Sequence, residues 1–221
     1  MYTSLFYKEW IKTRRPLLLL SAVFAATVAY ILLNVAKLYQ ANPVALWEFI
    51  VQNNAAQAGY LKYLTLGAGI ALALVQLAPE MQNKRLKLTL HLPLNESKIV
   101  GSILWFGIVA LTGLYLASGA ILLAGLTVYF PAEIVSANLL AMLPWMLGGL
   151  AAYLFAAWIC LEPVWRQRVL YTIPALGCTS LFYLDALPGA YLPFVPWLAS
   201  LTVAGFAFPF YSAIRFKQGV Q

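Results

Sequence analysis

Residues 16–33 read PLLLLSAVFAATVAYILL, an apolar run of 18 residues that decides the fold class. A helix rises about 1.5 Å per residue and needs about 20 apolar residues to cross the hydrocarbon core of a bilayer. Four basic residues between Lys8 and Arg15 precede the run, and no polar cleavage region follows it. We therefore interpret the run as a retained first transmembrane span and not as a cleaved signal peptide.

The composition of the whole chain agrees with lipid as the surrounding solvent. Of the 221 residues, 63% are hydrophobic and only 10% are charged. Soluble domains are about 45–50% apolar and about 25% charged, because polar side chains must cover their surface. This chain has too few charges for that, so the composition predicts an integral membrane protein.

Six apolar stretches divide the sequence. They run over 16–36, 61–78, 100–130, 138–161, 169–187 and 192–214. Backbone amides find no partners in lipid, so each stretch is expected to be a helix, and the lack of strict alternation argues against barrel strands. The fold class predicted is an all-α membrane protein: an N-terminal amphipathic segment over 1–15, then one six-helix transmembrane domain over 16–221.

The positive charges predict the orientation. Twelve Lys and Arg residues fall on one side of the six stretches, whereas only Lys37 and Lys62 fall on the other. The twelve are Lys8, Lys12, Arg14, Arg15, Lys84, Arg85, Lys87, Lys98, Arg166, Arg168, Arg215 and Lys217. Basic loops stay cytoplasmic during insertion, so both termini are expected inside. The same clusters explain the net charge of +7 without nucleic-acid binding, since no basic face or aromatic RNA-binding motif accompanies them.

The expected spans carry almost no groups for chemistry. Glu162 and Asp185 lie at span boundaries, where we expect solvated carboxylates, and His91 has no evident partner in its loop. Without embedded bases, acids or metal ligands, neither catalysis nor self-sufficient ion coupling is indicated. The chain also lacks a Gly-x-x-x-x-Gly-Lys-Ser/Thr phosphate loop. Any transport work would draw its energy from a partner.

The inner loop over 79–98 has a distinctive pattern. Its leucines are Leu86, Leu88, Leu90 and Leu92, and polar residues separate them. The alternation by itself indicates a short strand, and Pro93 ends the segment. The simplest interpretation is a solvated positive loop, but four leucines in one short loop imply a surface that something covers.

At this point the sequence resembles the type-2 family of ABC exporter permeases. Such permeases have an N-terminal elbow helix, here carried by Phe6, Tyr7, Trp10, Arg14 and Arg15. An acidic residue closes their second span, here Glu80, and a basic, leucine-containing segment ending in Leu-Pro follows. The matching residues are Lys84, Arg85, Leu86, Leu88, Leu90, Leu92 and Pro93. Family members usually carry Gly-Thr or Gly-Ser near positions 85–86, and Arg85-Leu86 departs from that pattern.

The resemblance implies a function and its partners. Residues 82–93 would form a coupling helix that docks on a separate ATP-binding subunit, and Trp165 and Arg166 of the second inner loop would make a smaller contact. Interface anchoring at the lipid headgroups explains those two residues equally well. ATP and Mg would be bound by the partner, with no cofactor in this chain. A second permease copy or a related permease would complete the path, in a bacterial cytoplasmic membrane.

Two other readings stay open. The haem-exporter permease of cytochrome c maturation has a similar length and layout, although no histidine is placed to ligate haem on the outside. A membrane scaffold or assembly subunit without transport activity would explain the lack of embedded charge equally well.

Overall fold

The computed structural model describes residues 2–44, 46, 48, 50, 57–82, 96–184 and 189–218. Within these ranges all regular structure is helical. The longer elements are α1 (Tyr2–Ala41), α3 (Leu61–Met81), α5 (Glu96–Leu126), α6 (Ala132–Leu161), α7 (Trp165–Ser180), α8 (Val195–Gly205) and α9 (Ala207–Gln218). Short 3-10 turns are η1 (Gln57–Tyr60), η3 (Leu181–Tyr183) and η4 (Leu192–Phe194). The predicted all-α class is confirmed.

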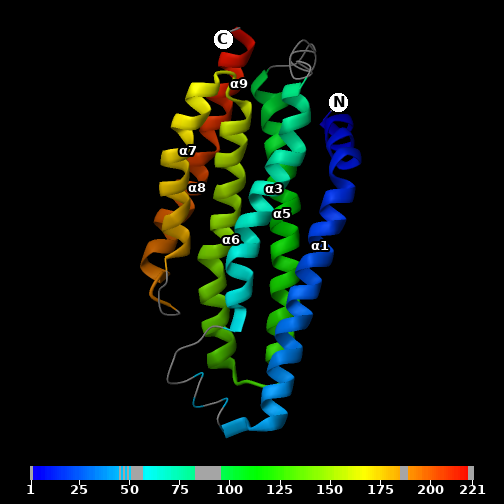
Figure 1. The fold of residues 1–221 in the computed structure, drawn as a ribbon, viewed down its shortest axis with the longest axis vertical. Coiled ribbons are helices and arrows are strands. Elements are labelled where there is room, and N and C mark those ends of the chain that lie inside the picture. Colours follow the sequence, from blue (N-terminus) through cyan, green and yellow to red (C-terminus); the bar gives the residue numbers. More distant parts are fainter. Residues whose placement is uncertain are drawn as a thin grey trace.

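The helices form one elongated bundle (Figure 1). The start of α1, the C-terminal end of α3, the junction between α6 and α7 and the end of α9 all lie at one end of it. We call this the termini end. Helix α6 lies between α3 and the group formed by α7, α8 and α9, and it packs against most of the other helices.

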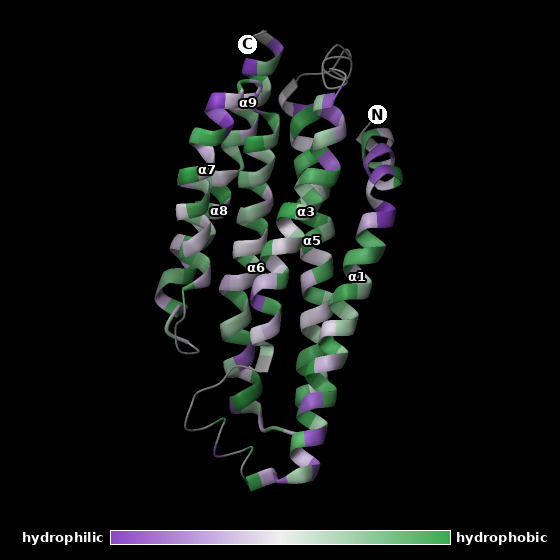
Figure 2. Cartoon of the chain, in the orientation of Figure 1, coloured by the Kyte–Doolittle hydropathy of each residue, from purple (hydrophilic) through white to green (hydrophobic). Residues whose placement is uncertain are grey.

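The described part of the chain has five helices long and apolar enough to cross a membrane: Thr3–Ala41, Ala58–Met81, Ser97–Leu126, Ala132–Leu161 and Leu192–Lys217. They correspond to the first four expected spans and the sixth. Figure 2 shows apolar residues along the length of these helices. Large apolar side chains also face outward, as at Leu18, Leu19 and Ile173. Outward apolar faces of this extent need lipid as solvent, so the architecture is that of a membrane protein.

The fifth expected span, 169–187, is not a single long helix among the described residues. Its counterpart α7 has 16 residues and continues into the 3-10 turn η3, while residues 185–188 are not described. Sixteen residues rise about 24 Å, which is short of the roughly 30 Å hydrocarbon core. The third expected stretch also ends early, since α5 stops at Leu126 and residues 127–130 form the turn before α6.

The predicted N-terminal elbow is wrong as a separate element. Residues 2–15 continue without a break into the first span, and Pro16 lies inside the 40-residue helix α1. A proline removes one backbone hydrogen bond, but membrane helices tolerate it where neighbouring groups compensate. The first turns of α1 are in addition held to α3 by the ion pairs described below, which keep them in line with the bundle.

The closest contact in the bundle joins α3 to α6. A Cβ atom built on Gly69 would lie 2.1 Å from the carbonyl oxygen of Gly149, and a Cβ on Gly149 would lie 2.8 Å from that of Thr65. Only glycine lets the two backbones approach this far. Small residues are the usual means of close helix packing in lipid, where van der Waals contact drives association. Tyr115 closes the contact from α5, donating a hydrogen bond of 2.8 Å to the Thr65 carbonyl.

We expect Gly69→Ala to destabilise the folded chain, because the added methyl group meets backbone that cannot rotate away. Overpacking of this kind costs about 1–3 kcal/mol. Gly113→Ala in α5 is the matched control, since a Cβ there meets nothing within 4 Å. Thermal unfolding in detergent measures both variants. Equal melting temperatures would contradict the proposed role of the contact between α3 and α6.

Candidate functional site

Glu80 occupies the last turn of α3 at the termini end, and its side chain is only 6% exposed. Two lysines of α1 reach it: Lys8 Nζ lies 2.9 Å and Lys12 Nζ 3.0 Å from Glu80 Oε1. Because charges in a low-dielectric interior are costly unless paired, these contacts hold the start of α1 against the end of α3.

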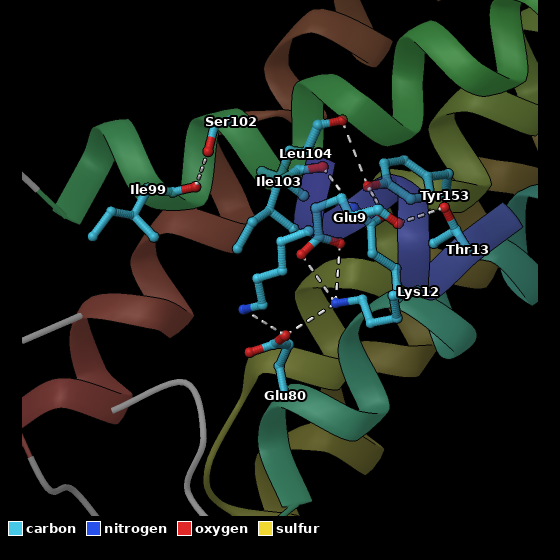
Figure 3. A network of polar contacts seen from close by, with 11 residues as sticks. Glu9, Lys12, Thr13, Glu80, Ile99, Ser102, Ile103, Leu104 and Tyr153 are labelled. Carbon is cyan, nitrogen blue, oxygen red and sulfur yellow. Dashed lines mark hydrogen bonds and ion pairs between the residues drawn. The ribbon is translucent and has the colours of Figure 1, made fainter. Parts of the chain in front are cut away.

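Lys12 also pairs with a second carboxylate. Its Nζ lies 3.0 Å from Glu9 Oε1, and the two residues share one face of α1 at a spacing of three. Glu9 is buried, and Thr13 donates a hydrogen bond of 2.8 Å to its backbone carbonyl. Figure 3 shows Lys12 between Glu9 and Glu80. We call Lys8, Glu9, Lys12 and Glu80 the charge cluster. Its two carboxylates balance its two ammonium groups, so the cluster carries no net charge.

A neutral polar contact lies one turn deeper in the bundle. Gln76, four residues before Glu80 on α3, donates a hydrogen bond of 2.8 Å to the Ile103 carbonyl of α5. Tyr153 of α6 donates one of 2.8 Å to Gln76 Oε1. The tyrosine fits because Gly107 faces it: a Cβ there would lie 2.1 Å from the Tyr153 hydroxyl oxygen. Three helices are thereby joined just below the charge cluster.

A second buried ion pair lies at the same end of the bundle. Glu162, directly after α6, is fully buried, with Oε1 3.2 Å from Arg215 Nη1 and with Ser212 Oγ donating a 2.7 Å hydrogen bond to Oε2. Arg168 Nε donates a hydrogen bond of 2.6 Å to the Glu162 backbone carbonyl. Arg215 also donates to Gln167 and, at 3.2 Å, to the Tyr171 hydroxyl. This group ties α9 and α7 to the end of α6.

The expectation that Glu162 is solvated is wrong. The chain reverses directly after α6, and the C-terminal part of α9 packs over the carboxylate. The sequence places Glu162 at a span boundary, but it does not show that another helix end covers that boundary. The partner, Arg215, lies 53 positions further along the chain.

Apart from Glu80, the predicted coupling and elbow residues fall into three groups. Lys84, Arg85, Leu86, Leu88, Leu90, Leu92 and Pro93 lie outside the described residues, as does His91. Trp165 and Arg166 are exposed at the start of α7. Of the elbow residues, Phe6 packs edge-on against Phe106 at 5.8 Å between ring centroids, whereas Tyr7, Trp10, Arg14 and Arg15 are exposed.

The charge cluster therefore joins two segments that the sequence treats separately. Glu80 is named from the sequence as a coupling residue, but Lys8 and Lys12 enter only as orientation signals. The spacing of Glu9 and Lys12 by three residues is a local sign of an ion pair on one helix face. Nothing local indicates that Lys8 and Lys12 share Glu80, 68 positions after Lys12, as a partner.

Comparison of the chain with models of known protein families, with characterised proteins and with solved structures finds no match in any of the three. Among the described residues, no group of three or more His, Cys, Asp or Glu side chains is arranged to hold a metal ion.

We expect Lys12→Met to destabilise the chain, because Glu9 and Glu80 would keep buried charge with fewer partners. Removing one partner of a buried pair costs about 3–5 kcal/mol, and the remaining Lys8 places this variant at the lower end, about 3 kcal/mol. Arg15→Met, an exposed position on the same helix, is the control. Unfolding in detergent measures both. If the double variant Lys12→Met with Glu80→Gln is as unstable as Lys12→Met alone, then the unpaired charge of Glu80 is not the cause of the destabilisation.

Arg215→Met is expected to lower the free energy of unfolding by about 3–5 kcal/mol, since Glu162 would remain buried without its cation. Arg166→Met provides the comparison, because its side chain is exposed at the same end of the bundle. The same melting experiment applies. If both variants lose the same free energy of unfolding, then the loss comes from removing a basic charge near the membrane surface and not from breaking the buried pair.

Proposed function

We propose that this chain is the transmembrane subunit of an ATP-driven ABC exporter in a bacterial cytoplasmic membrane. A separate subunit binds and hydrolyses ATP with Mg. The carrying observation is the charge cluster, which links α1 to the end of α3 directly before the loop that resembles a coupling segment. A push on that loop would move both helices together.

The layout of the bundle supports this proposal. Both ends of the described chain lie at the termini end, as an even number of crossings requires (Figure 1). We infer six crossings, with α7 and η3 together providing the fifth, and a cytoplasmic termini end because twelve of the fourteen basic residues belong there. The coupling loop and the α6–α7 junction then face the compartment that holds ATP.

The mechanical step follows from how the helices are joined. Closure of the ATP-binding subunits would displace the loop after α3, and Glu80 would carry Lys8 and Lys12 with it. Gln76 and Tyr153 would pass the same displacement to α5 and α6. Packed helices move as rigid bodies and switch between discrete arrangements, which is how a path between two permease subunits would change the side it faces. One six-helix half does not enclose a path alone, so we propose a dimer with a second copy or a related permease.

We expect Leu88→Asp with Leu90→Asp to abolish co-purification with a candidate ATP-binding subunit. The two carboxylates would place charge in an apolar docking surface. The matched control is Leu38→Asp with Val44→Asp, which adds the same charge at exposed positions on the opposite end of the bundle. This control should bind the subunit as the unchanged chain does.

Unchanged binding by the Leu88 and Leu90 variant, with the bundle still folded, would refute the docking assignment. A stable complex of the unchanged chain that contains no ATPase would favour the scaffold function instead. Stimulation of the partner's ATPase activity by a transported compound would favour the exporter.

A further inference from the structure

A cavity of about 420 Å³ lies between α3, α6 and α7, away from the charge cluster. Its size falls in the range of about 300–1,000 Å³ that is usual for small-molecule sites. The walls include Leu66 and Ile70 of α3, Phe155 and Ile159 of α6, and Ala175 and Leu176 of α7. The cavity is therefore lined mainly by hydrocarbon.

The cavity exists because α7 is attached to the bundle near both of its ends. At the termini end, Tyr171 stacks on Trp158 at 4.3 Å and accepts a hydrogen bond from Arg215. At the other end, Phe182 of η3 is fully buried and Tyr183 donates a 3.2 Å hydrogen bond to the Trp145 carbonyl. Between these attachments Ala175 and Thr179 pack toward α6, but α7 stands away from α3, and the space between α3 and α7 is left open.

The chemistry of the wall selects an uncharged occupant. No side chain among the described residues that line the cavity is charged. The hydroxyls of Thr172, Thr179 and Ser180 each donate to a backbone carbonyl of α7 at 2.6–2.8 Å. Their protons are therefore already used. A phosphate or an ammonium group would find no counter-charge here, whereas a hydrocarbon chain meets a wall of its own polarity.

The mouth of the cavity faces outward between α3 and α7. Tyr63 and Leu176 line it and are 68% and 69% exposed, on surfaces that belong in lipid. A helix of a second copy is about 10 Å wide, so this volume would take only about one turn of it. A single hydrocarbon chain is much narrower and enters lengthwise.

We propose that this cavity holds one acyl chain of a bilayer phospholipid. The acyl chain enters from the membrane between α3 and α7 and fills the space against α6. The bound lipid supports the face of α7 that turns toward α3, whereas Ala175 and Thr179 hold the middle of α7 against α6. This inference does not rest on the proposed transport function, and its test requires no ATP-binding subunit.

The test uses the purified full chain in vesicles of phosphatidylethanolamine and phosphatidylglycerol that contain a phospholipid with a diazirine in one acyl chain. After irradiation, peptide mass spectrometry locates the label. We expect the label to be concentrated on Leu66, Ile70 and Phe155, above the level at the lipid-facing Leu18 and Leu19. Even labelling of all outward apolar faces would overturn the proposal.

Filling the cavity gives the decisive comparison. Ala156 lines it, so Ala156→Phe is expected to lower labelling of the cavity residues roughly tenfold, as the ring displaces buried methylenes. Ala120→Phe adds the same ring on an exposed face of α5 and should leave labelling unchanged. Equal labelling in the two variants would refute the assignment.

Two further measurements keep the result interpretable. If Ala156→Phe does not fold, Leu176→Trp at the exposed mouth blocks entry without entering the core, and the same loss of label is expected. Occupancy by a second copy predicts a different result: no label in the cavity, and disulfide-linked dimers of a Leu176→Cys chain in which Cys160 and Cys178 are changed to Ala. That result would overturn the proposal.

Discussion

The contact between Gly69 and Gly149 is the constraint on which the bundle depends. It brings the backbones of α3 and α6 closer than any side chain would allow, and Tyr115 hydrogen-bonds across it from α5. Lipid provides no hydrophobic force between helices, so such close packing supplies much of the attraction. With α6 set in this position, α7, α8 and α9 pack on it, and Tyr153 reaches Gln76 of α3.

The buried ion pairs of Glu80 and Glu162 both lie at the termini end of the bundle, and that position has a physical reason. Buried charge is least costly near the membrane surface, where water and partner side chains are within reach. Glu80 and Glu162 each close a helix at that end, and each binds basic residues from a distant part of the chain. The start of α1 and the end of α9 are both fastened there, so a displacement of either connection at the termini end would be shared by helices at both sides of the bundle.

The half of the molecule around α7 is built differently. Helix α7 packs on α6 and is anchored near both of its ends, but an apolar cavity lies between it and α3. Helix α7 contains Pro174 and Gly177 and is shorter than α3 and α6. Weakly packed helices of this kind move more easily than the centre of a bundle, because few contacts must be broken. A lipid chain in the cavity would restore the missing contacts without joining α7 permanently to α3.

The sequence alone determined that this is an all-helical membrane protein, where five of its long helices lie, and that charge is confined near the ends of spans. Those features follow from local hydropathy, because lipid rejects unpaired backbone and isolated charge. Only the tertiary structure decided that residues 2–15 extend the first helix, that Glu162 is buried, and that Lys8 and Lys12 share Glu80. These depend on which helix ends meet in space. A hydropathy pattern indicates which residues lie in lipid, but it does not indicate which residues of other helices they contact.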